Sequence, residues 1–172
     1  RKGHENMIID THAHYDDKAF NEDREVLLES LDIHRIVNIG SSLGACNRTI
    51  ELMEKYDFIY GALGVHPTDS GELTDSDIEW LRQQCALEKC VAVGEIGLDY
   101  YWDSSEKELQ KEWFARQLVL ADMKQLPVII HSRDAAADTL EIMKTEYEAS
   151  GKTLTGVIHC FSYEAEIARE YV

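Results

Sequence analysis

The stretch Met7-Ile8-Ile9-Asp10-Thr11-His12-Ala13-His14 joins a short apolar run to two histidines. The run over residues 7–11 has the composition of a buried β-strand. Residues two apart on an extended chain point to one face, so the imidazoles of His12 and His14 can hold one metal ion. Two surface histidines beside a turn would explain the motif taken alone. The histidines further along the chain favour the metal interpretation.

Five more short apolar runs follow, and they alternate with longer amphipathic segments. This alternation is typical of repeated βα units that build a parallel sheet. The predicted strands are residues 7–11, 35–39, 58–63, 91–94, 127–130 and 154–158. Helix starts are predicted at Thr74, with Asp77 three residues on, and at Ser105, with Glu108 three residues on. Gly151 is expected to end a helix.

Ligand-type side chains stand at the ends of five of these predicted strands. They are His12 and His14 after the first, His66 after the third, Glu95 after the fourth, His131 at the end of the fifth and His159 at the end of the sixth. An open doubly wound sheet has one crevice, whereas a closed ring brings all its strand ends together. The pattern therefore favours an α/β fold of the TIM-type (β/α)8 barrel, of which about six βα units are present.

Glu95 follows the apolar run Val91-Ala92-Val93-Gly94, so its carboxylate is expected in a crowded interior. A buried charge is costly unless it is paired or coordinates a metal. A salt bridge to Arg133 would satisfy it, but we favour metal, because two carboxylate oxygens can bridge two ions. His131 and His159 are each explained equally well as core histidines. Together, at neighbouring strand ends, they indicate a second metal site.

The loops after the third and fifth strands carry Gly64-Val65-His66-Pro67 and His131-Ser132-Arg133-Asp134. A guanidinium can grip phosphate with two parallel hydrogen bonds, so Arg133 and His66 are predicted to contact a substrate phosphate. An ion pair of Arg133 with Asp134 or Glu95 is the alternative. Asp99 is expected to support a histidine from behind, or else to cap its loop. Tyr100, Tyr101 and Trp102 either stack a base or pack the loop.

These motifs, taken in order, resemble the TatD family of metal-dependent deoxyribonucleases along the whole chain. The resemblance implies a distorted (β/α)8 barrel with two divalent ions, which could be zinc, manganese, magnesium, iron or nickel. It implies one ion on His12, His14 and Glu95, and another on Glu95, His131 and His159. It also implies DNA as the substrate. The family carries a further metal-binding aspartate in a later Thr-Asp motif, which is absent from this sequence.

The 172 residues, 44% of them hydrophobic, suit one domain over residues 1–172. An eight-stranded barrel typically needs about 250 residues. We therefore expect the domain to be truncated at its C-terminal side, with the first and sixth strands left as edges. Further chain, or less readily a partner subunit, would close the gap. The isolated fragment is expected to aggregate, bind metal weakly and show little nuclease activity.

The formal net charge of −16 argues against long contacts with duplex nucleic acid. If the substrate is DNA, as the resemblance implies, this charge favours single strands or ends, held locally by metal ions and a few basic groups. The scattered Cys46, Cys85, Cys90 and Cys160 match neither a zinc ribbon nor a disulfide framework, and no apolar run reaches about 18 residues. A cytoplasmic location is expected, with no membrane and no obligate protein partner.

The expected function is hydrolysis of phosphodiesters at a dinuclear metal site, as in a TatD-like deoxyribonuclease. An amidohydrolase-like enzyme that attacks an amide, ester or lactone is the nearest alternative, since similar ligand sets serve those substrates. A metal-binding protein without catalytic activity is more distant. Activity on nucleic acid, compared with activity on acyl substrates, separates these hypotheses.

Overall fold

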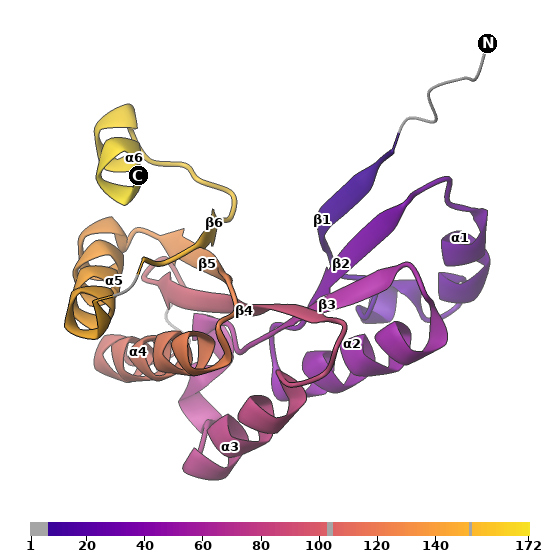
Figure 1. Cartoon of the computed structure of the whole chain (residues 1–172), viewed down its shortest axis with the longest axis horizontal. Helices are drawn as coiled ribbons and strands as arrows, with labels where there is room; N and C mark the ends of the chain where they lie inside the picture. Colours follow the sequence, from indigo (N-terminus) through magenta and orange to yellow (C-terminus); the bar gives the residue numbers. More distant parts are fainter. Residues whose placement is uncertain (1–6, 103–104, 152) are drawn as a thin grey trace.

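The computed structural model describes residues 7–102, 105–151 and 153–172 and contains one curved parallel sheet (Figure 1). The strands pair in the order β1-β2-β3-β4-β5-β6. Their bounds are β1 Ile9–Ala13, β2 Arg35–Ile39, β3 Ile59–Leu63, β4 Cys90–Asp99, β5 Val128–Arg133 and β6 Gly156–Ile158. Each strand pairs with its successor, so the order never reverses as it does in a doubly wound sheet. The predicted barrel-type winding is confirmed.

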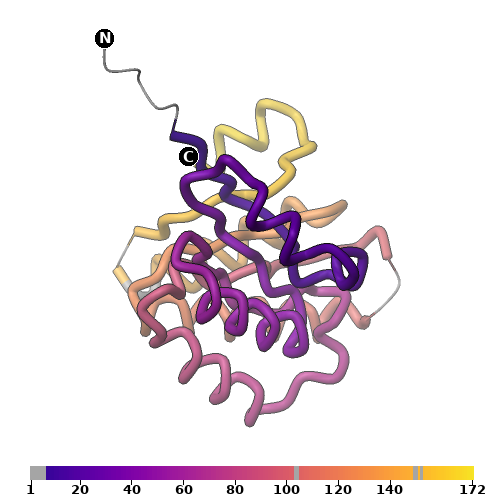
Figure 2. Tube along the Cα trace, turned by 90° about the vertical axis from the view of Figure 1, so that its right-hand side faces the viewer, coloured from indigo at the N-terminus to yellow at the C-terminus, as the bar shows by residue number. Residues whose placement is uncertain are grey.

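Helices cover the convex side of the sheet. Figure 1 shows α2 to α5 along this outer side, and Figure 2 shows β1 and α6, the first and last elements, lying away from α3. The helical segments are η1 Lys18–Phe20, α1 Arg24–Ser30, α2 Leu43–Lys55, η2 Pro67–Glu72, α3 Asp75–Gln84, α4 Lys107–Lys124, α5 Ala136–Ser150 and α6 Ala165–Tyr171. In the described residues, no helix is long and apolar enough to pass through a membrane.

Alternation along the strands divides the core between the two faces of the sheet. Leu63, Val93 and Ile130 belong to the largest buried cluster, together with Phe114 and Leu118 of α4. Their sequence neighbours Ala62, Ala92 and Ile129 form a separate cluster with Ile39. Successive side chains on a strand point to opposite faces, so this second cluster lies on the face turned away from α4. Burying a side chain such as Phe114 stabilises the fold by about 1.5–3 kcal/mol.

β4 and β5 both continue beyond their predicted ends at Gly94 and Ile130. Ile96 and Leu98 are fully buried, and they alternate with Glu95, Gly97 and Asp99. The register shifts between Val93 and Ile96, and the alternation then resumes with polar groups on one face, where a loop had been predicted. Glu95 and His131 consequently lie within strands and not at their ends. β1 begins two residues later than predicted, after the exposed residues Met7 and Ile8.

Two of the three predicted helix boundaries are confirmed. α3 follows Thr74, whose N–H donates to the Asp77 carboxylate at 2.8 Å, and α5 ends at Gly151 with a φ of 66°. The start predicted at Ser105 is wrong, because α4 begins after Glu106. The Ser105 hydroxyl instead donates to the Pro67 carbonyl at 2.8 Å and so ties this loop to η2.

Candidate metal centre

The inner face of β4 presents two carboxylates to one histidine of β5. Glu95, Gly97 and Asp99 alternate along β4, and Gly97 is in register with His131. Gly97 has a φ of 138°, and a Cβ there would lie 1.9 Å from the His131 carbonyl oxygen. Only glycine tolerates this close approach and this backbone conformation. It allows β5 to lie against β4 with His131 between the two acidic side chains.

His131 contacts both carboxylates at once. Its Nδ1 lies 3.2 Å from Glu95 Oε1 and its Nε2 lies 2.9 Å from Asp99 Oδ2. Burial opposes a charged imidazole, but the hydrogen bonds to Glu95 and then to Asp99 outweigh it and raise the pKa of His131. For Glu95, burial alone would raise the pKa of the carboxyl group. Hydrogen bonds with His12 and His131 outweigh burial and hold that pKa well below its ordinary value. Glu95 is therefore a buried, ionised carboxylate.

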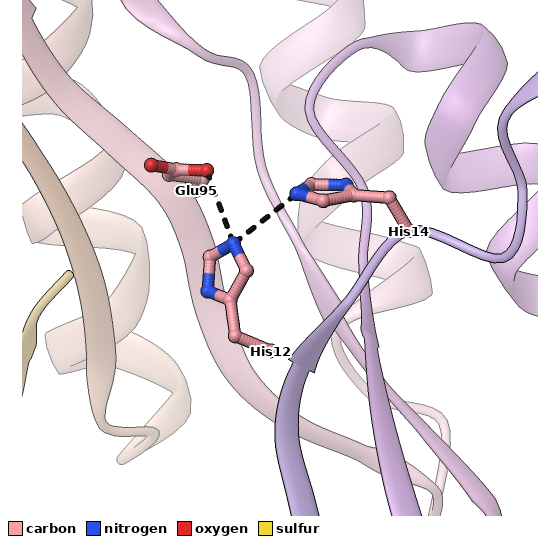
Figure 3. A group of neighbouring side chains, drawn as sticks. All are labelled: His12, His14 and Glu95. Atoms are coloured by element: carbon pink, nitrogen blue, oxygen red, sulfur yellow. Dashed lines mark hydrogen bonds and ion pairs between the residues drawn. The ribbon is translucent and has the colours of Figure 1, made fainter. Parts of the chain in front are cut away.

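His12 of β1, His14 just after β1 and Glu95 of β4 converge (Figure 3). His12 Nε2 lies 3.1 Å from His14 Nε2 and 3.5 Å from Glu95 Oε2. The Nδ1 of His14 lies 3.1 Å from the Ile39 carbonyl oxygen. A carbonyl only accepts, so His14 Nδ1 carries the proton, and its Nε2 lone pair faces His12 and Glu95. Such a carbonyl contact is the usual support of a metal-binding histidine.

The donor atoms of these three residues lie within 4.8 Å of one another. Imidazole nitrogens and a carboxylate oxygen are the ligand types preferred by zinc and similar divalent metals. The Nε2 atoms of His12 and His14 lie 3.1 Å apart, and with the proton of each ring on Nδ1 both would face the same cation. The side chains therefore fit a divalent ion.

The remaining histidines lie beside this group. The His159 ring stacks on His12 with 3.5 Å between centroids and 6° between planes, and the His66 ring meets His131 edge-on at 4.2 Å. A second set of donor atoms within 4.8 Å consists of His66, Asp99 and His131. Within the described part of the chain, His159 joins neither set, although it lies directly against His12.

His66 is fixed as a neutral hydrogen-bond donor. Its Nδ1 accepts the Thr68 N–H at 3.3 Å, so the ring proton is on Nε2. Burial, and then the positive charge of His131, lower the pKa of His66 to about 4. A neutral imidazole with a proton on Nε2 donates a hydrogen bond from that atom. Such a donor suits a phosphate oxygen better than a metal ion.

Arg133 is exposed at the end of β5, and Asp99 is buried at the end of β4. The guanidinium carbon of Arg133 lies 3.9 Å from the Tyr101 ring centroid. No ion pair joins Arg133 to Glu95 or Asp134, all of which the structure describes, so the alternative roles considered for Arg133 are not seen. Asp99 both supports a histidine and caps its loop, the two roles that were considered for it. Besides its contact with His131, its Oδ1 accepts the N–H groups of Tyr101 and Trp102 at 2.9 and 3.0 Å.

Two buried glutamines on α4, missed by the sequence analysis, hold the backbone next to the site. The Gln110 amide bonds the N–H and the carbonyl of Asp99 at 2.9 and 3.0 Å. The Gln117 amide does the same for Val65 at 2.8 and 3.1 Å. Residues seven apart lie on one helix face. Polar residues at this spacing in the apolar stripe of a helix were the available signal.

Asn38 holds the chain after His14 in a similar way. It is fully buried in β2, and its Oδ1 accepts the Tyr15 N–H at 2.7 Å. Its Nδ2 donates to Asp16 at 3.0 Å and to Thr49 at 2.8 Å. Asparagine is rare at a fully buried strand position unless its amide is satisfied in this way. The single amide in the apolar run Ile36-Val37-Asn38-Ile39 could have predicted this buried hydrogen-bonding residue.

The curved parallel sheet places this chain in the class of (β/α) barrel proteins. The cluster of histidines and a carboxylate on its inner side is a candidate metal site. The chain belongs to the TatD related DNase family, whose family model matches residues 9–172. A Bacillus subtilis relative named as an uncharacterized metal-dependent hydrolase, YabD, is 43% identical over 167 residues, which cover 95% of this chain and 64% of that protein.

Solved structures give the same result. The crystal structure of YjjV, a TatD homologue from Escherichia coli, has a TM-score of 0.84 and 34% identity and covers 95% of this chain and 64% of that chain. A TatD family hydrolase from Entamoeba histolytica has a TM-score of 0.83 and 27% identity, with 95% and 61% covered. The chain therefore spans less than two thirds of the length of these relatives.

Proposed function

We propose that the protein is a metal-dependent hydrolase that cleaves phosphodiester bonds of DNA, preferably at strand ends or in single strands. The observation that carries this proposal is the group of His12, His14 and Glu95 donor atoms within 4.8 Å of one another at the inner side of the sheet. Membership of the TatD related DNase family supports the chemistry.

His12, His14 and Glu95 would hold one divalent ion, and Glu95, His131 and His159 a second. Divalent cations, when bound, lower the pKa of water and stabilise charge on the oxygens of a phosphodiester. The Glu95 carboxylate has one oxygen towards His12 and the other towards His131, so it faces both proposed sites. Each carboxylate oxygen would then serve a different one of the two sites.

The residues at the rim would position the substrate. The Nε2–H of His66 can donate to a phosphate oxygen, since its Nδ1 is already occupied by Thr68. The guanidinium of Arg133 lies over an aromatic ring and has no carboxylate partner in the described residues, so its donors are available for phosphate. Asp99 would keep His131 oriented from the opposite side of the ring.

The charge balance argues for local binding. With a formal net charge of −16, the protein repels a long polyanion except where cations concentrate. A strand end or a short single strand needs few phosphate contacts, so it experiences less of this repulsion. Hydrolysis at strand ends therefore suits this protein better than cleavage within long duplexes.

A panel of substrates tests the proposal. A full-length form, stripped of metal, should be supplied with manganese, zinc or magnesium and offered single-stranded, duplex and end-blocked DNA, together with amide, ester and lactone substrates. We expect cleavage of DNA with a free end, slower cleavage of blocked ends and no acyl hydrolysis. Hydrolysis of an acyl substrate with intact DNA would favour the amidohydrolase-like alternative. Metal binding without any hydrolysis would contradict both enzyme assignments.

A further inference from the structure

The aromatic residues after β4 divide into one packing residue and two exposed ones. The Tyr100 hydroxyl donates to the Asp138 carboxylate at 2.6 Å, and its ring packs against the main hydrophobic core. Tyr101 and Trp102 are 54% and 56% exposed. Packing of the loop is therefore accomplished by Tyr100. The exposure of two large rings side by side at the rim of a candidate site needs another explanation.

The exposed pair is fixed to the site by a single carboxylate. Asp99 Oδ1 accepts the backbone N–H groups of Tyr101 and Trp102, while Asp99 Oδ2 lies 2.9 Å from His131 Nε2. Asp99 itself is 1% exposed and is held at its backbone by Gln110. The backbone that carries the two rings is thus anchored one side chain away from a proposed metal ligand.

The two rings have different surroundings. The Tyr101 ring has the Arg133 guanidinium over its face at 3.9 Å. The Trp102 ring lies 4.9 Å from that of Tyr101, centroid to centroid, at 88° between planes. Because the rings are perpendicular, they do not stack face to face, and much of the Trp102 indole stays open. A guanidinium beside an open aromatic surface is a combination that binds single-stranded nucleic acids, because the cation contacts phosphate and the ring stacks on a base.

We infer that Trp102 stacks on a nucleobase of the DNA strand whose phosphate contacts Arg133. In this arrangement Tyr101 is a positioning residue that holds the guanidinium by a cation–π contact. The inference rests on the proposed function and adds to it a subsite that recognises any base by its aromatic face. Stacking of this kind tolerates every sequence but requires an unpaired base, which a single strand or a frayed end provides.

Binding without metal tests the stacking independently of hydrolysis. The intrinsic fluorescence of metal-free protein should be quenched by a short single-stranded oligonucleotide in the wild type and in Trp80→Phe, a control on α3. Trp102→Phe should lose this quenching yet still bind a labelled oligonucleotide, whereas Trp102→Ala should bind it about 5- to 100-fold more weakly. Equal affinity of Trp102→Ala and the wild type would overturn the inference.

Substrates with a single abasic position test the same contact during cleavage. We expect one position next to the cleaved bond at which loss of the base lowers kcat/KM for the wild type but not for Trp102→Ala. Equal sensitivity of both proteins would contradict stacking while leaving DNA hydrolysis in place. If the wild type binds DNA through Trp102 but cleaves none, hydrolysis fails and the stacking subsite stands.

The role of Tyr101 has its own signature. Tyr101→Phe keeps the ring and should behave like the wild type, whereas Tyr101→Leu should raise KM with little change in kcat. In a background of Arg133→Ala, Tyr101→Leu should have no further effect on KM, since the positioned group is already absent. An additive effect of the two substitutions would contradict positioning through Arg133.

Discussion

The Gln110 side chain completes both backbone hydrogen bonds of Asp99, accepting its N–H at 2.9 Å and donating to its carbonyl at 3.0 Å. α4 therefore fixes the residue that orients His131. Gln110→Ala would leave buried backbone groups unsatisfied, at about 1–3 kcal/mol for each. We expect a loss of this order in the free energy of unfolding, measured with urea. Gln83→Ala, on the exposed side of α3, should change it by less than about 0.5 kcal/mol. An unchanged free energy of unfolding in Gln110→Ala would contradict a stabilising role for these two hydrogen bonds.

Removing one imidazole of the proposed metal site on His12, His14 and Glu95 should weaken metal binding. His14→Ala deletes the Nε2 lone pair that faces His12 and Glu95, and it leaves the Ile39 carbonyl without its partner. Even the loss of a supporting contact costs about 10- to 100-fold in metal affinity, so loss of a ligand should cost at least that. Calorimetric titration with zinc measures the effect. His34→Ala, an exposed histidine away from the cluster, is the matched control. Unchanged zinc affinity in His14→Ala would show that His14 is not a metal ligand.

Arg133→Ala should chiefly raise KM for DNA. Two charge-assisted hydrogen bonds to a phosphate correspond to roughly 10- to 100-fold in KM. Arg133→Lys keeps the charge but loses the paired geometry, so it should restore part of the loss. Steady-state kinetics on a single-stranded oligonucleotide gives both parameters. A fall in kcat with KM unchanged would show that Arg133 acts on the transition state and not on substrate binding.

Metal binding should release a proton at neutral pH. Although burial favours the neutral ring, Glu95 and Asp99 raise the pKa of His131 above its ordinary value of about 6.5. The stabilisation from this charged ring is full below about pH 6.5 and is lost as pH rises through the folded-state pKa. A cation on His131 must displace the proton, so metal affinity should fall as pH decreases through that pKa.

Calorimetry in buffers of different ionisation enthalpy measures the released proton directly. At pH 7 the apparent heat should depend on the buffer in the wild type and depend on it less in His131→Gln. A heat that is the same in every buffer would show that His131 is already neutral or does not bind the ion.

The general location of the site could be predicted because strand periodicity and residue chemistry are local properties of the sequence. An imidazole or carboxylate that follows an apolar run indicates the end of a strand. Because the strand ends of a barrel meet at one face, His12, His14 and His66 could be placed near one another. The path of β4 could not be predicted in this way. Its polar residues Glu95 and Asp99 have the sequence pattern of a loop until a neighbouring strand supplies their partner.

Specific side-chain contacts that depend on the curvature of the sheet could not be predicted from the sequence. His159 follows β6 and His12 belongs to β1, and these strands are the two edges of the sheet. Only the curl of six strands brings the two rings to 3.5 Å. The pairing of Gln110 with Asp99 depends likewise on how α4 docks. The extent of the domain beyond these strands, and its closure by further chain, stay predictions.

The central claim is that phosphodiester cleavage depends on metal held at Glu95. The most direct test uses an active full-length form, stripped of metal, and measures its cleavage of a single-stranded oligonucleotide before and after manganese is added back. The proteins compared are the wild type, Glu95→Gln and the exposed control Glu88→Gln. A neutral amide cannot bridge two cations well, so Glu95→Gln should lose at least about 100-fold in rate, while the other two proteins recover. Cleavage that resists chelation, or full recovery in Glu95→Gln, would contradict the metal mechanism.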